Sequence, residues 1–354
     1  MEKKIKVLVV DDSAVVRKIL STGLGRDPEI EVVGTAADPF IARDKIISLR
    51  PDVLTLDVEM PRMDGISFLQ RLMVYYPLPV IMVSSLTQAG CETTLKALEV
   101  GAFDFVAKPS LDVSHSLEEI ISEIVEKVKA ASRAKIKKRE LPGDGGVKNG
   151  AVKPVQVQAS QALIKSTHKI VAIGASTGGT EALKEVLMQM PPNAPGILIV
   201  QHMPQLFTKS FAERLDSLCS IEVREARDGD SIIPGLALIA PGNYHMELRR
   251  NGARYFVTTN QSPPVRRHRP SVEVMFESVA KYAGANAIGV IMTGMGDDGA
   301  NGLLRMKESG AQTMAQDEES CVVFGMPKEA IKLGAANTVV SLQKITPTIL
   351  SLLN

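Results

Sequence analysis

Short apolar runs alternate with helical patterns along this chain of 354 residues, and this alternation restricts the possible fold more than any other feature. Near the N-terminus the apolar runs are continuous, which is typical of strands that are buried on both faces. The predicted strands are Val7–Val10, Glu31–Gly34, Val53–Leu56, Val80–Val83 and Asp104–Val106. Strands separated by helices predict a parallel sheet of five strands that is covered on both faces.

The segments between these strands have the periodicity of helices. We expect helices at Ala14–Leu24, Pro39–Leu49, Gly65–Tyr75, Glu92–Glu99 and Leu117–Ala131. Asp38 and Pro39 mark the start of the second helix, because aspartate caps free backbone amides and proline fits the first helical position. The last helix carries an apolar stripe that can close one face of the sheet.

A change of composition divides the chain. A basic run at 133–139 is followed by a stretch rich in Gly, Pro, Lys and Gln that has no sustained periodicity. We therefore expect a first domain at 1–131, a linker at 132–167 and a second domain at 168–354. Two domains also agree with the chain length, because single cores rarely grow beyond about 250 to 300 residues.

The strand and helix patterns resume after the linker. Strands are predicted at Ile170–Ile173, Ile197–Val200 and Ala287–Met292, and helices at Glu181–Met190, at Leu206–Leu218 and from about Ala300. The pattern indicates a doubly wound α/β domain with a mainly parallel sheet. Leu236–Ile239 and Met246–Thr258 predict an antiparallel portion, with Asn251 and Gly252 at a hairpin turn.

Composition excludes several classes of function. With 41 basic and 40 acidic side chains the net charge is +1, and the basic run at 133–139 lacks interleaved aromatic residues, so we expect no nucleic acid partner. The chain has no apolar run long enough to span a membrane and no signal-peptide pattern. Cys91, Cys219 and Cys321 are odd in number and widely spaced, which predicts buried thiols in a reducing compartment. We expect a cytoplasmic protein without membrane insertion.

Three carboxylates follow strands of the first domain. Asp11 and Asp12 come directly after the first strand, and Asp57 ends the third. The carboxyl ends of parallel strands share one edge of the sheet, where Ser84 and Lys108 also follow strands. Carboxylate oxygens suit Mg²⁺ together with a phosphate group. The arrangement predicts phosphoryl transfer to Asp57, with Lys108 and the metal neutralising the phosphoryl oxygens.

A possible serine nucleophile opens the second domain. Ser176 lies in a G-x-S-x-G segment between a predicted strand and helix, although such a turn can also cradle a phosphate or simply cap the helix. His202 follows the next strand and is the best candidate for a base, whereas the other histidines are weaker candidates. Asp297 or Asp298 could orient it. The other histidines are His115, His168, His245 and His268.

The same acidic loop permits a second interpretation. Residues 294–299 read GMGDDG between a strand and a helix, and Asp317 has a suitable spacing for a ribose-binding acid. A phosphorylation-gated nucleotide-binding module is therefore the alternative function. Two carboxylates within the loop argue against this function. A pyrophosphate binds best to helix N-terminal amides that have no negative charges beside them.

The first domain resembles the response-regulator receiver family. The resemblance is carried by Asp11-Asp12-Ser13, LDVEMPRMDG, IMVSSLT and FDFVAKP, and it covers residues 1–130. It implies a CheY-like, flavodoxin-like fold and a chemotaxis histidine kinase as phosphodonor. The implied residues are Asp57 as phosphate acceptor, Asp11, Asp12 and the Glu59 backbone carbonyl at Mg²⁺, and Ser84 with Phe105 as the switch pair.

The second domain resembles the catalytic domain of CheB methylesterases. The motifs are GASTGGTEAL, QHMPQLFTKSFAERL, IAPGNYHMEL, PPVRRHRPSVEVMF, GVIMTGMGDDGANG and SCVVFGMPKEAI. The family implies Ser176 as nucleophile, His202 as base and Asp298 as orienting acid, without a cofactor for the esterase step. The implied substrates are glutamate γ-methyl esters on methyl-accepting chemotaxis receptors, which release methanol, and receptor glutamines, which would be deamidated.

Less specific expectations concern the surroundings of the serine. Backbone amides of Thr177 or Met295 are candidates for the oxyanion hole. The cluster Arg266, Arg267, His268 and Arg269 matches the family motif RHRPSV and could meet an acidic receptor surface. The order of the domains suggests that phosphorylation of Asp57 disfavours an interface that covers Ser176, and the linker would permit the domains to separate.

Overall fold

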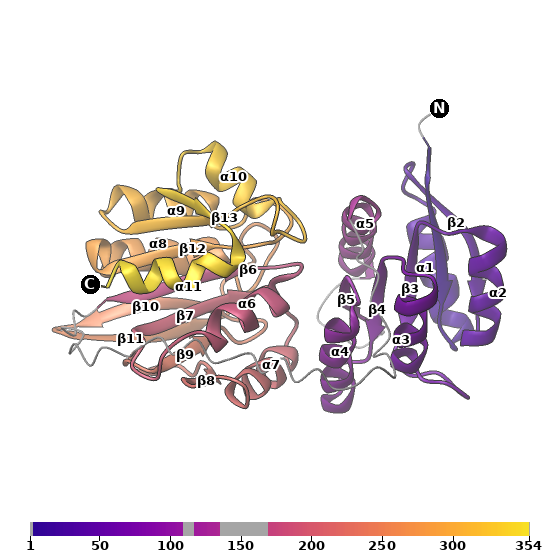
Figure 1. Ribbon diagram of the computed structural model, residues 1–354, viewed down its shortest axis with the longest axis horizontal. Coiled ribbons are helices and arrows are strands. Elements are labelled where there is room, and N and C mark those ends of the chain that lie inside the picture. Colours follow the sequence, from indigo (N-terminus) through magenta and orange to yellow (C-terminus); the bar gives the residue numbers. More distant parts are fainter. Residues whose placement is uncertain (1–2, 109–116, 135–168, 354) are drawn as a thin grey trace, which may run out of the picture.

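The computed structural model describes residues 3–108, 117–134 and 169–353. Two α/β units are visible in Figure 1, an N-terminal unit (residues 3–134) and a C-terminal unit (residues 169–353). The predicted linker falls almost entirely on residues 135–168, which lie outside the described residues, as does His115. The helix before it runs to Arg133, two residues beyond the predicted end at Ala131.

The N-terminal unit contains the predicted five-stranded parallel sheet, in the order β2-β1-β3-β4-β5. Its elements are β1 (Ile5–Val10), α1 (Ala14–Leu24), β2 (Ile30–Ala36), α2 (Pro39–Leu49), β3 (Val53–Asp57), α3 (Gly65–Tyr75), β4 (Val80–Ser84), α4 (Gln88–Val100), β5 (Asp104–Ala107) and α5 (Leu117–Arg133). Helix α4 begins four residues before its predicted start, because the hydroxyl of Thr87 accepts a hydrogen bond from the Gly90 amide and caps the helix.

Side chains of β1 point alternately to the two faces of this sheet. Val7 and Val9 pack against a cluster with α1 and α5, whereas Leu8 and Val10 join the cluster under α2, α3 and α4. Both faces are therefore buried, and only the ends of the strands are left for polar chemistry.

The C-terminal unit is built around a seven-stranded parallel sheet in the order β14-β13-β12-β6-β7-β9-β8. Its strands are β6 (Ile170–Ala175), β7 (Gly196–Gln201), β8 (Glu222–Glu225), β9 (Leu236–Ile239), β10 (His245–Asn251), β11 (Arg254–Asn260), β12 (Ala287–Ile291), β13 (Gln312–Gln316) and β14 (Thr338–Val340). Its helices are α6 (Gly179–Met188), α7 (Phe207–Asp216), α8 (Val272–Tyr282), the short 3₁₀ helix η1 (Gly284–Asn286), α9 (Ala300–Glu308), α10 (Met326–Lys332) and α11 (Leu342–Ser351).

One strand prediction for this unit was wrong. Leu236–Ile239 does not join the antiparallel portion but lies as β9 between β7 and β8, parallel to both. All four of its side chains are buried, as expected for a strand covered on both faces. The hairpin prediction is confirmed, because β10 and β11 pair antiparallel and Gly252 supplies a positive φ of 58° at the turn.

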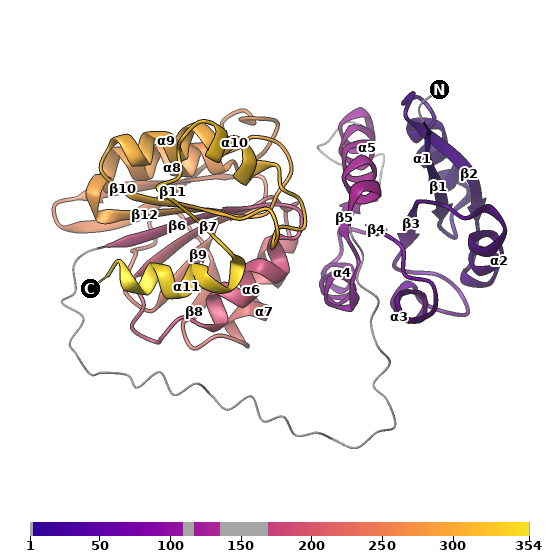
Figure 2. The same ribbon diagram turned by 45° about the horizontal axis from the view of Figure 1, so that its top comes forward.

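Helices cover both faces of the larger sheet. Figures 1 and 2 show α6, α7 and α11 on one side and α8, α9 and α10 on the other. The division agrees with the two buried clusters, in which Val171 and Ile173 face α6 and α7 while Ile170 and Ala172 face α8. The β10–β11 hairpin lies against α8, where the Ser278 hydroxyl accepts a hydrogen bond from the Leu248 amide.

The cysteines differ from the prediction at two positions. All three are free thiols, and Cys91 is buried as expected. Cys219 and Cys321 are only partly buried, because each lies in a loop after a secondary-structure element rather than inside one. Burial raises the pKa of Cys91 to about 11, so this thiol is protonated at neutral pH.

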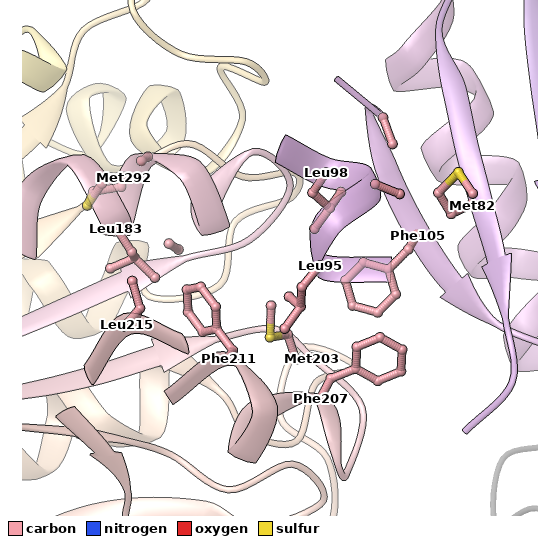
Figure 3. Packing of buried hydrophobic residues seen from close by; sticks show 14 of the residues in the cluster. Met82, Leu95, Leu98, Phe105, Leu183, Met203, Phe207, Phe211, Leu215 and Met292 are labelled. Carbon is pink, nitrogen blue, oxygen red and sulfur yellow. The ribbon is translucent and has the colours of Figure 1, made fainter. Parts of the chain in front are cut away.

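The two units share an apolar cluster. Figure 3 shows Leu95 and Phe105 of the N-terminal unit beside Met203, Phe207 and Phe211 of the C-terminal unit. The rings of Phe105 and Phe207 stack with their centroids 4.4 Å apart. Both rings are buried, so the units are joined by a hydrophobic interface in this structure.

Candidate functional site

The carboxylates predicted in the N-terminal unit do converge. Asp11, Asp12 and Asp57 each offer an oxygen, and these oxygens lie within 4.8 Å of one another at the carboxyl edge of the sheet. The Nζ atom of Lys108 lies 2.7 Å from Asp57 Oδ2 and 3.6 Å from Asp11 Oδ2. The short loops after β1, β3 and β5 therefore bring three acids and one cation together.

Burial controls the charges at this edge. Burial raises the pKa of Asp57 to about 6, although its hydrogen bond with Lys108 acts in the opposite direction. Burial also raises the pKa of Asp11. For Lys108 burial alone would lower the pKa, but the hydrogen bond to Asp57 raises it above its ordinary value. The ammonium group thus stays charged beside a carboxylate that is costly to ionise.

The donor set fits a divalent cation. Asp11 Oδ2 is buried and accepts no hydrogen bond from the residues that the structure describes. An orphaned carboxylate oxygen in a group of three acids is a suitable ligand for Mg²⁺, which takes oxygen donors and retains some of its water. The acidic residues and their surroundings therefore agree with the predicted metal site.

Three other residues predicted for this site lie close to it. The amide of Glu59 donates to Asp57 Oδ1 at 3.1 Å, so the loop after β3 folds over the acceptor. The hydroxyl of Ser84 accepts a 2.7 Å hydrogen bond from Thr94, which links the end of β4 to α4. Phe105 is buried and directed to the other unit, where it stacks on Phe207. A switch pair formed by Ser84 and Phe105 would therefore border the interface.

Ser176 and His202 lie at the ends of neighbouring strands in the C-terminal unit. The last pair of the β6–β7 register is Ala175 with Gln201, and the amide of His202 donates to the carbonyl of Ala175 at 3.2 Å. Ser176 directly follows Ala175 and is partly exposed. The predicted nucleophile and base therefore come from adjacent positions of one sheet edge.

The turn that carries Ser176 requires small neighbours. Gly178 has a φ of +77° and leads into α6, a conformation that residues with a side chain rarely adopt. Gly294, in the loop after β12, approaches from the other side, where an added Cβ would lie 2.7 Å from the Cβ of Ser176. The Ser176 amide donates to the carbonyl of Thr293 at 3.0 Å, so this amide is not free to bind a substrate oxygen.

Asp298, and not Asp297, reaches the histidine. Its Oδ2 lies 2.8 Å from His202 Nε2, and both side chains are more than nine-tenths buried. The same carboxylate accepts hydrogen bonds from the Ser271 hydroxyl and from the amides of Val272 and Glu273. These last two amides open helix α8, where a negative charge is stabilised by unpaired N–H groups.

The hydrogen bonds fix the charge of this acid. Burial alone would raise the pKa of Asp298, but the hydrogen bonds from His202 and Ser271 lower it below its ordinary value. An ionised carboxylate can only accept, so the proton between the two groups belongs to His202 Nε2. His202 Nδ1 is buried and has no hydrogen-bond partner among the described residues. In a neutral imidazole with its proton on Nε2, Nδ1 is the nitrogen that can act as a base.

The amides predicted for an oxyanion hole are also available. The amides of Thr177 and Met295 donate no hydrogen bond to other described residues. The Thr177 side chain is engaged elsewhere, because its hydroxyl donates to Asp104 Oδ2 of the N-terminal unit at 2.5 Å. Either amide could stabilise negative charge beside Ser176.

The four residues of the basic cluster have different surroundings. Arg266 forms an exposed ion pair with Asp297, and Arg267 forms one with Glu126 of α5 in the N-terminal unit. Arg269 donates to Asn243 and to two backbone carbonyls, which gives it a structural role. The ring of His268 stacks on His202, with centroids 3.7 Å apart and planes 11° apart. Of these four residues, Arg266 is the one that is exposed and has its ion pair within the C-terminal unit.

Of the remaining histidines, His245 alone lies among the described residues. His168 lies outside the described residues. His245 is buried, donates from Nε2 to the carbonyl of Pro263 and accepts from the Ser271 amide, so it supports the start of α8. Burial lowers the pKa of His245. Neither of its nitrogens is free for proton transfer.

The glycine-rich loop does not have the geometry of a phosphate cradle. Its Asp298 is directed inward to His202, and the Gly299 amide at the start of α9 donates to the carboxylate of Glu273. Asp317 accepts hydrogen bonds from Ser320, three residues later. The helix N-terminus that would bind a pyrophosphate is thus filled by an acid of the chain itself, which argues against the nucleotide alternative.

Several residues that support the site had no signal in the sequence. Gln201 donates to the carbonyl of Ser176, and Thr293 donates to the carbonyl of Thr177 while it accepts from the amides of Val322 and Val323. These contacts join residues that are far apart in the chain. Helix α8 and the loop at 320–325 were also not predicted as parts of the site.

Charged contacts surround the apolar interface between the units. Glu99 of α4 pairs with Arg214 of α7 and with Lys184 of α6. Burial alone would raise the pKa of Glu99, but the hydrogen bonds from Arg214 and Lys184 lower it. Asp104, which binds Thr177, also pairs with Lys127 of α5 at 3.3 Å. Together with Arg267 and Glu126 these groups join α4, β5 and α5 to the side of the C-terminal unit that carries Ser176.

Comparison with known proteins assigns both units to families. The CheB methylesterase family matches residues 171–349, and the response regulator receiver domain matches residues 7–121. The chain belongs to the CheB methylesterase family. This family membership agrees with the α/β fold of both units, with a parallel sheet in each and a separate hairpin in the second.

Relatives of this CheB-family chain match it over its whole length. The protein-glutamate methylesterase/protein-glutamine glutaminase 2 of Syntrophus aciditrophicus is 58% identical over 98% of each chain. The protein-glutamate methylesterase/protein-glutamine glutaminase of Syntrophotalea carbinolica is 56% identical over 100% of this chain and 99% of its own. The crystal structure of the Thermotoga maritima CheB methylesterase catalytic domain is 41% identical, with a TM-score of 0.52 over 52% of this chain and 99% of that one.

None of the helices in the described part of this CheB-family chain has the length and apolar character needed to span a membrane.

Proposed function

We propose that this chain is a phosphorylation-activated protein-glutamate methylesterase. Its substrates would be glutamate γ-methyl esters on the cytoplasmic helices of methyl-accepting chemotaxis receptors, and receptor glutamines would be deamidated at the same site. Family membership and the names of the relatives support this substrate class. The observation that carries the chemistry is the bond between His202 Nε2 and Asp298, which leaves Nδ1 without a hydrogen-bond partner among the described residues, at the strand end beside Ser176.

Ser176 acts as the nucleophile in this mechanism. His202 Nδ1 takes the hydroxyl proton while Ser176 Oγ bonds to the ester carbonyl carbon, and Asp298 stabilises the imidazolium that forms. The tetrahedral oxyanion is held by the amides of Thr177 and Met295. His202 then returns the proton to the methoxy oxygen, the carbon–oxygen bond breaks, and methanol leaves an acyl-enzyme.

Water completes the reaction. His202 takes a proton from water as the water oxygen attacks the acyl carbon, and it then protonates Ser176 Oγ as the glutamate carboxyl group leaves. With a glutamine substrate the same steps release ammonia in place of methanol. Every proton that moves passes through His202, so the esterase step uses no cofactor in this proposal.

The N-terminal unit supplies the regulation. We assign residues 1–131 to a receiver domain, 132–167 to a linker and 168–354 to the esterase domain. Asp57 is the phosphate acceptor, and a chemotaxis histidine kinase is the physiological donor. Asp11, Asp12, Asp57 and the Glu59 backbone carbonyl would hold Mg²⁺, which would supply positive charge to the phosphoryl oxygens. Lys108 neutralises the same charge from the side of β5.

Phosphorylation would act on the interface. The acceptor edge is joined to α4 through the bond between Ser84 and Thr94, and to β5 through Lys108, which follows it. Both α4 and β5 contact the C-terminal unit through Glu99, Asp104 and Phe105. A rearrangement of these elements would weaken the contact between the units. The population would then shift to an open form in which the units are apart and Ser176 is uncovered. Arg266 would then meet acidic receptor surface.

Methanol release tests the esterase assignment. The full-length protein is incubated with receptor membranes carrying radioactive methyl groups, with acetyl phosphate and Mg²⁺ as phosphodonor system. Wild type and an exposed-serine control, Ser220→Ala, release methanol, whereas Ser176→Ala keeps its fold and releases none above background. Retention of methanol release in Ser176→Ala would exclude this serine as the nucleophile. A wild-type chain that does not release methanol would exclude the proposed activity.

The location and the regulation have their own tests. A cytoplasmic location predicts that the chain appears in the soluble fraction of lysed cells and that recovery with membranes depends on receptors. Regulation predicts faster methanol release with acetyl phosphate for wild type and no stimulation for Asp57→Asn. Equal rates of wild type with and without the phosphodonor, at demonstrated phosphorylation, would contradict the regulatory proposal.

A further inference from the structure

The tight turn that leads to His268 has an unusual backbone. Val265 and His268 exchange hydrogen bonds in both directions, with N···O distances of 3.1 and 2.9 Å. The two residues between them, Arg266 and Arg267, have φ values of +52° and +69°. Two successive left-handed residues are the pattern of a type I′ turn, which strongly prefers asparagine and glycine. Arginines in these positions indicate a backbone that its surroundings hold in a disfavoured conformation.

Contacts on both sides hold this turn in place. Arg266 donates to Asp297 in the loop that carries Asp298, and Arg267 donates to Glu126 of the N-terminal unit. Beyond the turn, Arg269 donates to the side chain of Asn243. The turn is thus fixed to three segments in this structure, two of them within the C-terminal unit itself, and its geometry is more specific than that of a solvated basic loop.

The turn places one ring against the proposed base. The imidazoles of His268 and His202 lie nearly parallel, with centroids 3.7 Å apart and an interplanar angle of 11°. His202 has a single hydrogen bond from its ring, between Nε2 and Asp298, because Nδ1 has no partner among the described residues. One hydrogen bond fixes one edge of a ring but leaves it free to rotate about that contact. A flat neighbour against its face removes this freedom.

The charge of His268 is suited to this contact. Burial and the neighbouring His202 lower the pKa of His268 to about 3, so its ring is neutral at physiological pH. The charged groups that face it are Asp298, Arg267 and Lys127 in addition to His202. During the reaction His202 becomes positive, and a second cation stacked upon it would be repelled. A neutral aromatic face attracts an imidazolium instead, so the stack can persist through the proton transfer.

We propose that His268 is a positioning residue, whose flat ring holds His202 in the plane that joins Asp298 to the unpaired Nδ1. The inference rests on the proposed esterase function, and it replaces the expectation that His268 contacts the receptor directly. Catalytic side chains must be held within about 0.5 Å and 10 to 20° of the productive geometry. Loss of the stack should therefore lower the rate of the chemical step more than it weakens substrate binding. Arg266 remains the member of the cluster that is exposed to a substrate.

Three substitutions of His268 separate positioning from packing and from substrate contact. His268→Phe keeps a flat, uncharged ring, His268→Leu fills similar space without a flat face, and His268→Ala removes the side chain. In the phosphorylated full-length enzyme we expect kcat of the Phe variant within about threefold of wild type. We expect kcat of the Leu and Ala variants to be about 10- to 100-fold lower, with KM changed less than about twofold.

A second measurement does not depend on turnover. In ¹⁵N-histidine-labelled protein, the His202 Nε2 proton is assigned by its loss in Asp298→Asn, which removes the carboxylate charge that holds it. This proton signal should remain sharp in His268→Phe and broaden or exchange faster with water in His268→Leu and His268→Ala. Circular dichroism and the thermal midpoint establish that each variant is folded before these values are compared.

The outcomes distinguish the possible roles. Unchanged kcat in the folded Leu variant, or equal losses in the Phe and Leu variants, would overturn the positioning proposal. A higher KM with unchanged kcat would mean that His268 contacts the substrate. If wild type releases no methanol above background, the esterase function fails, while the Nε2 proton signal still reports whether His268 holds His202.

Discussion

The hydroxyl of Thr177 donates a 2.5 Å hydrogen bond to Asp104 Oδ2, so a residue of the receiver-type sheet touches the residue directly after the proposed nucleophile. Both side chains are buried, and the bond joins positions 73 residues apart in the chain. The bond therefore ties β5 of the N-terminal unit to the turn that carries Ser176. We expect it to restrain separation of the two units, and with it the access of a substrate to Ser176.

Replacing Asp104 should raise the basal esterase rate. A buried hydrogen bond to a charged group contributes about 1.5 to 3 kcal/mol, which corresponds to a shift of about 10- to 100-fold in the balance between closed and open forms. We expect Asp104→Ala without phosphodonor to release methanol several-fold faster than wild type, with a smaller further gain on phosphorylation. The exposed Asp44→Ala is the matched control. An unchanged basal rate would show that this bond does not restrain the enzyme.

Salt should have a related effect through Glu99. Its ion pairs with Arg214 and Lys184 border the apolar interface and are partly exposed, so dissolved ions screen them. Raising the salt concentration from about 0.05 to 0.5 M should increase the basal rate of wild type. Glu99→Gln should have a higher basal rate at low salt and respond less to added salt. Identical salt responses of the two proteins would argue against an electrostatic contribution to closure.

Asp298→Asn should inactivate the enzyme without preventing substrate binding. The amide can present its NH₂ group to His202 and force the imidazole into the wrong tautomer, and the comparable change in serine proteases lowers kcat about 10⁴-fold. Asp44→Asn is the control, because Asp44 lies exposed on the N-terminal unit in a surface ion pair with Arg43. Initial rates over a range of receptor concentrations separate kcat from KM. Similar rates in the two variants would remove Asp298 from the mechanism.

The carboxylate cluster should determine the magnesium requirement of phosphorylation. Removing one acid with Asp12→Ala lowers the negative charge available to a cation, and we expect at least a tenfold higher Mg²⁺ concentration for half-maximal phosphorylation by acetyl phosphate. Mass spectrometry of the intact chain measures the incorporated phosphate. Mg²⁺ should also raise the thermal midpoint of wild type more than that of Asp12→Ala. Equal midpoints with and without Mg²⁺ in wild type would contradict metal binding at this edge.

His268 should make stability sensitive to mild acid. Its pKa is lowered to about 3 in the folded protein and is near 6.5 in an unfolded chain, so between these values only the unfolded state takes up the proton. The free energy of unfolding therefore falls as the pH falls from about 6.5 toward 3. Asp298, whose pKa is lowered, loses its contribution only below about 3.9. Urea midpoints from about pH 7 to 4.5 should fall less steeply for His268→Phe. Parallel curves would contradict this account.

Sequence patterns were sufficient for the parts of the fold and site that depend on local order. Continuous apolar runs located most strands of both sheets, and Asp57, His202 and Asp298 lie at the carboxyl edges of the sheets, as their positions at or after strands predicted. The rule that parallel strands share one carboxyl edge accounts for this success. It also explains the error at Leu236–Ile239, because a short buried strand is equally compatible with several positions in a sheet and only its neighbours decide among them.

Contacts between distant segments could not be predicted in this way. The N-terminus of α8 holds Asp298, the turn before His268 holds His202, and β5 of the other unit holds Thr177. Each depends on how loops of different strands meet in three dimensions. The sequence contained the arginines of the strained turn, but their left-handed backbone and the ring stack appear only in the folded chain.

The stacked rings of Phe105 and Phe207 should make the separation of the two units depend on temperature. Separating the units would bring these rings and their neighbours Leu95 and Met203 into contact with water, and exposure of apolar surface raises the heat capacity. The free energy of opening would then depend on temperature along a curve, with closure strongest at an intermediate temperature. Warming or cooling of the cell would thus change the basal esterase rate even at a constant level of phosphorylation.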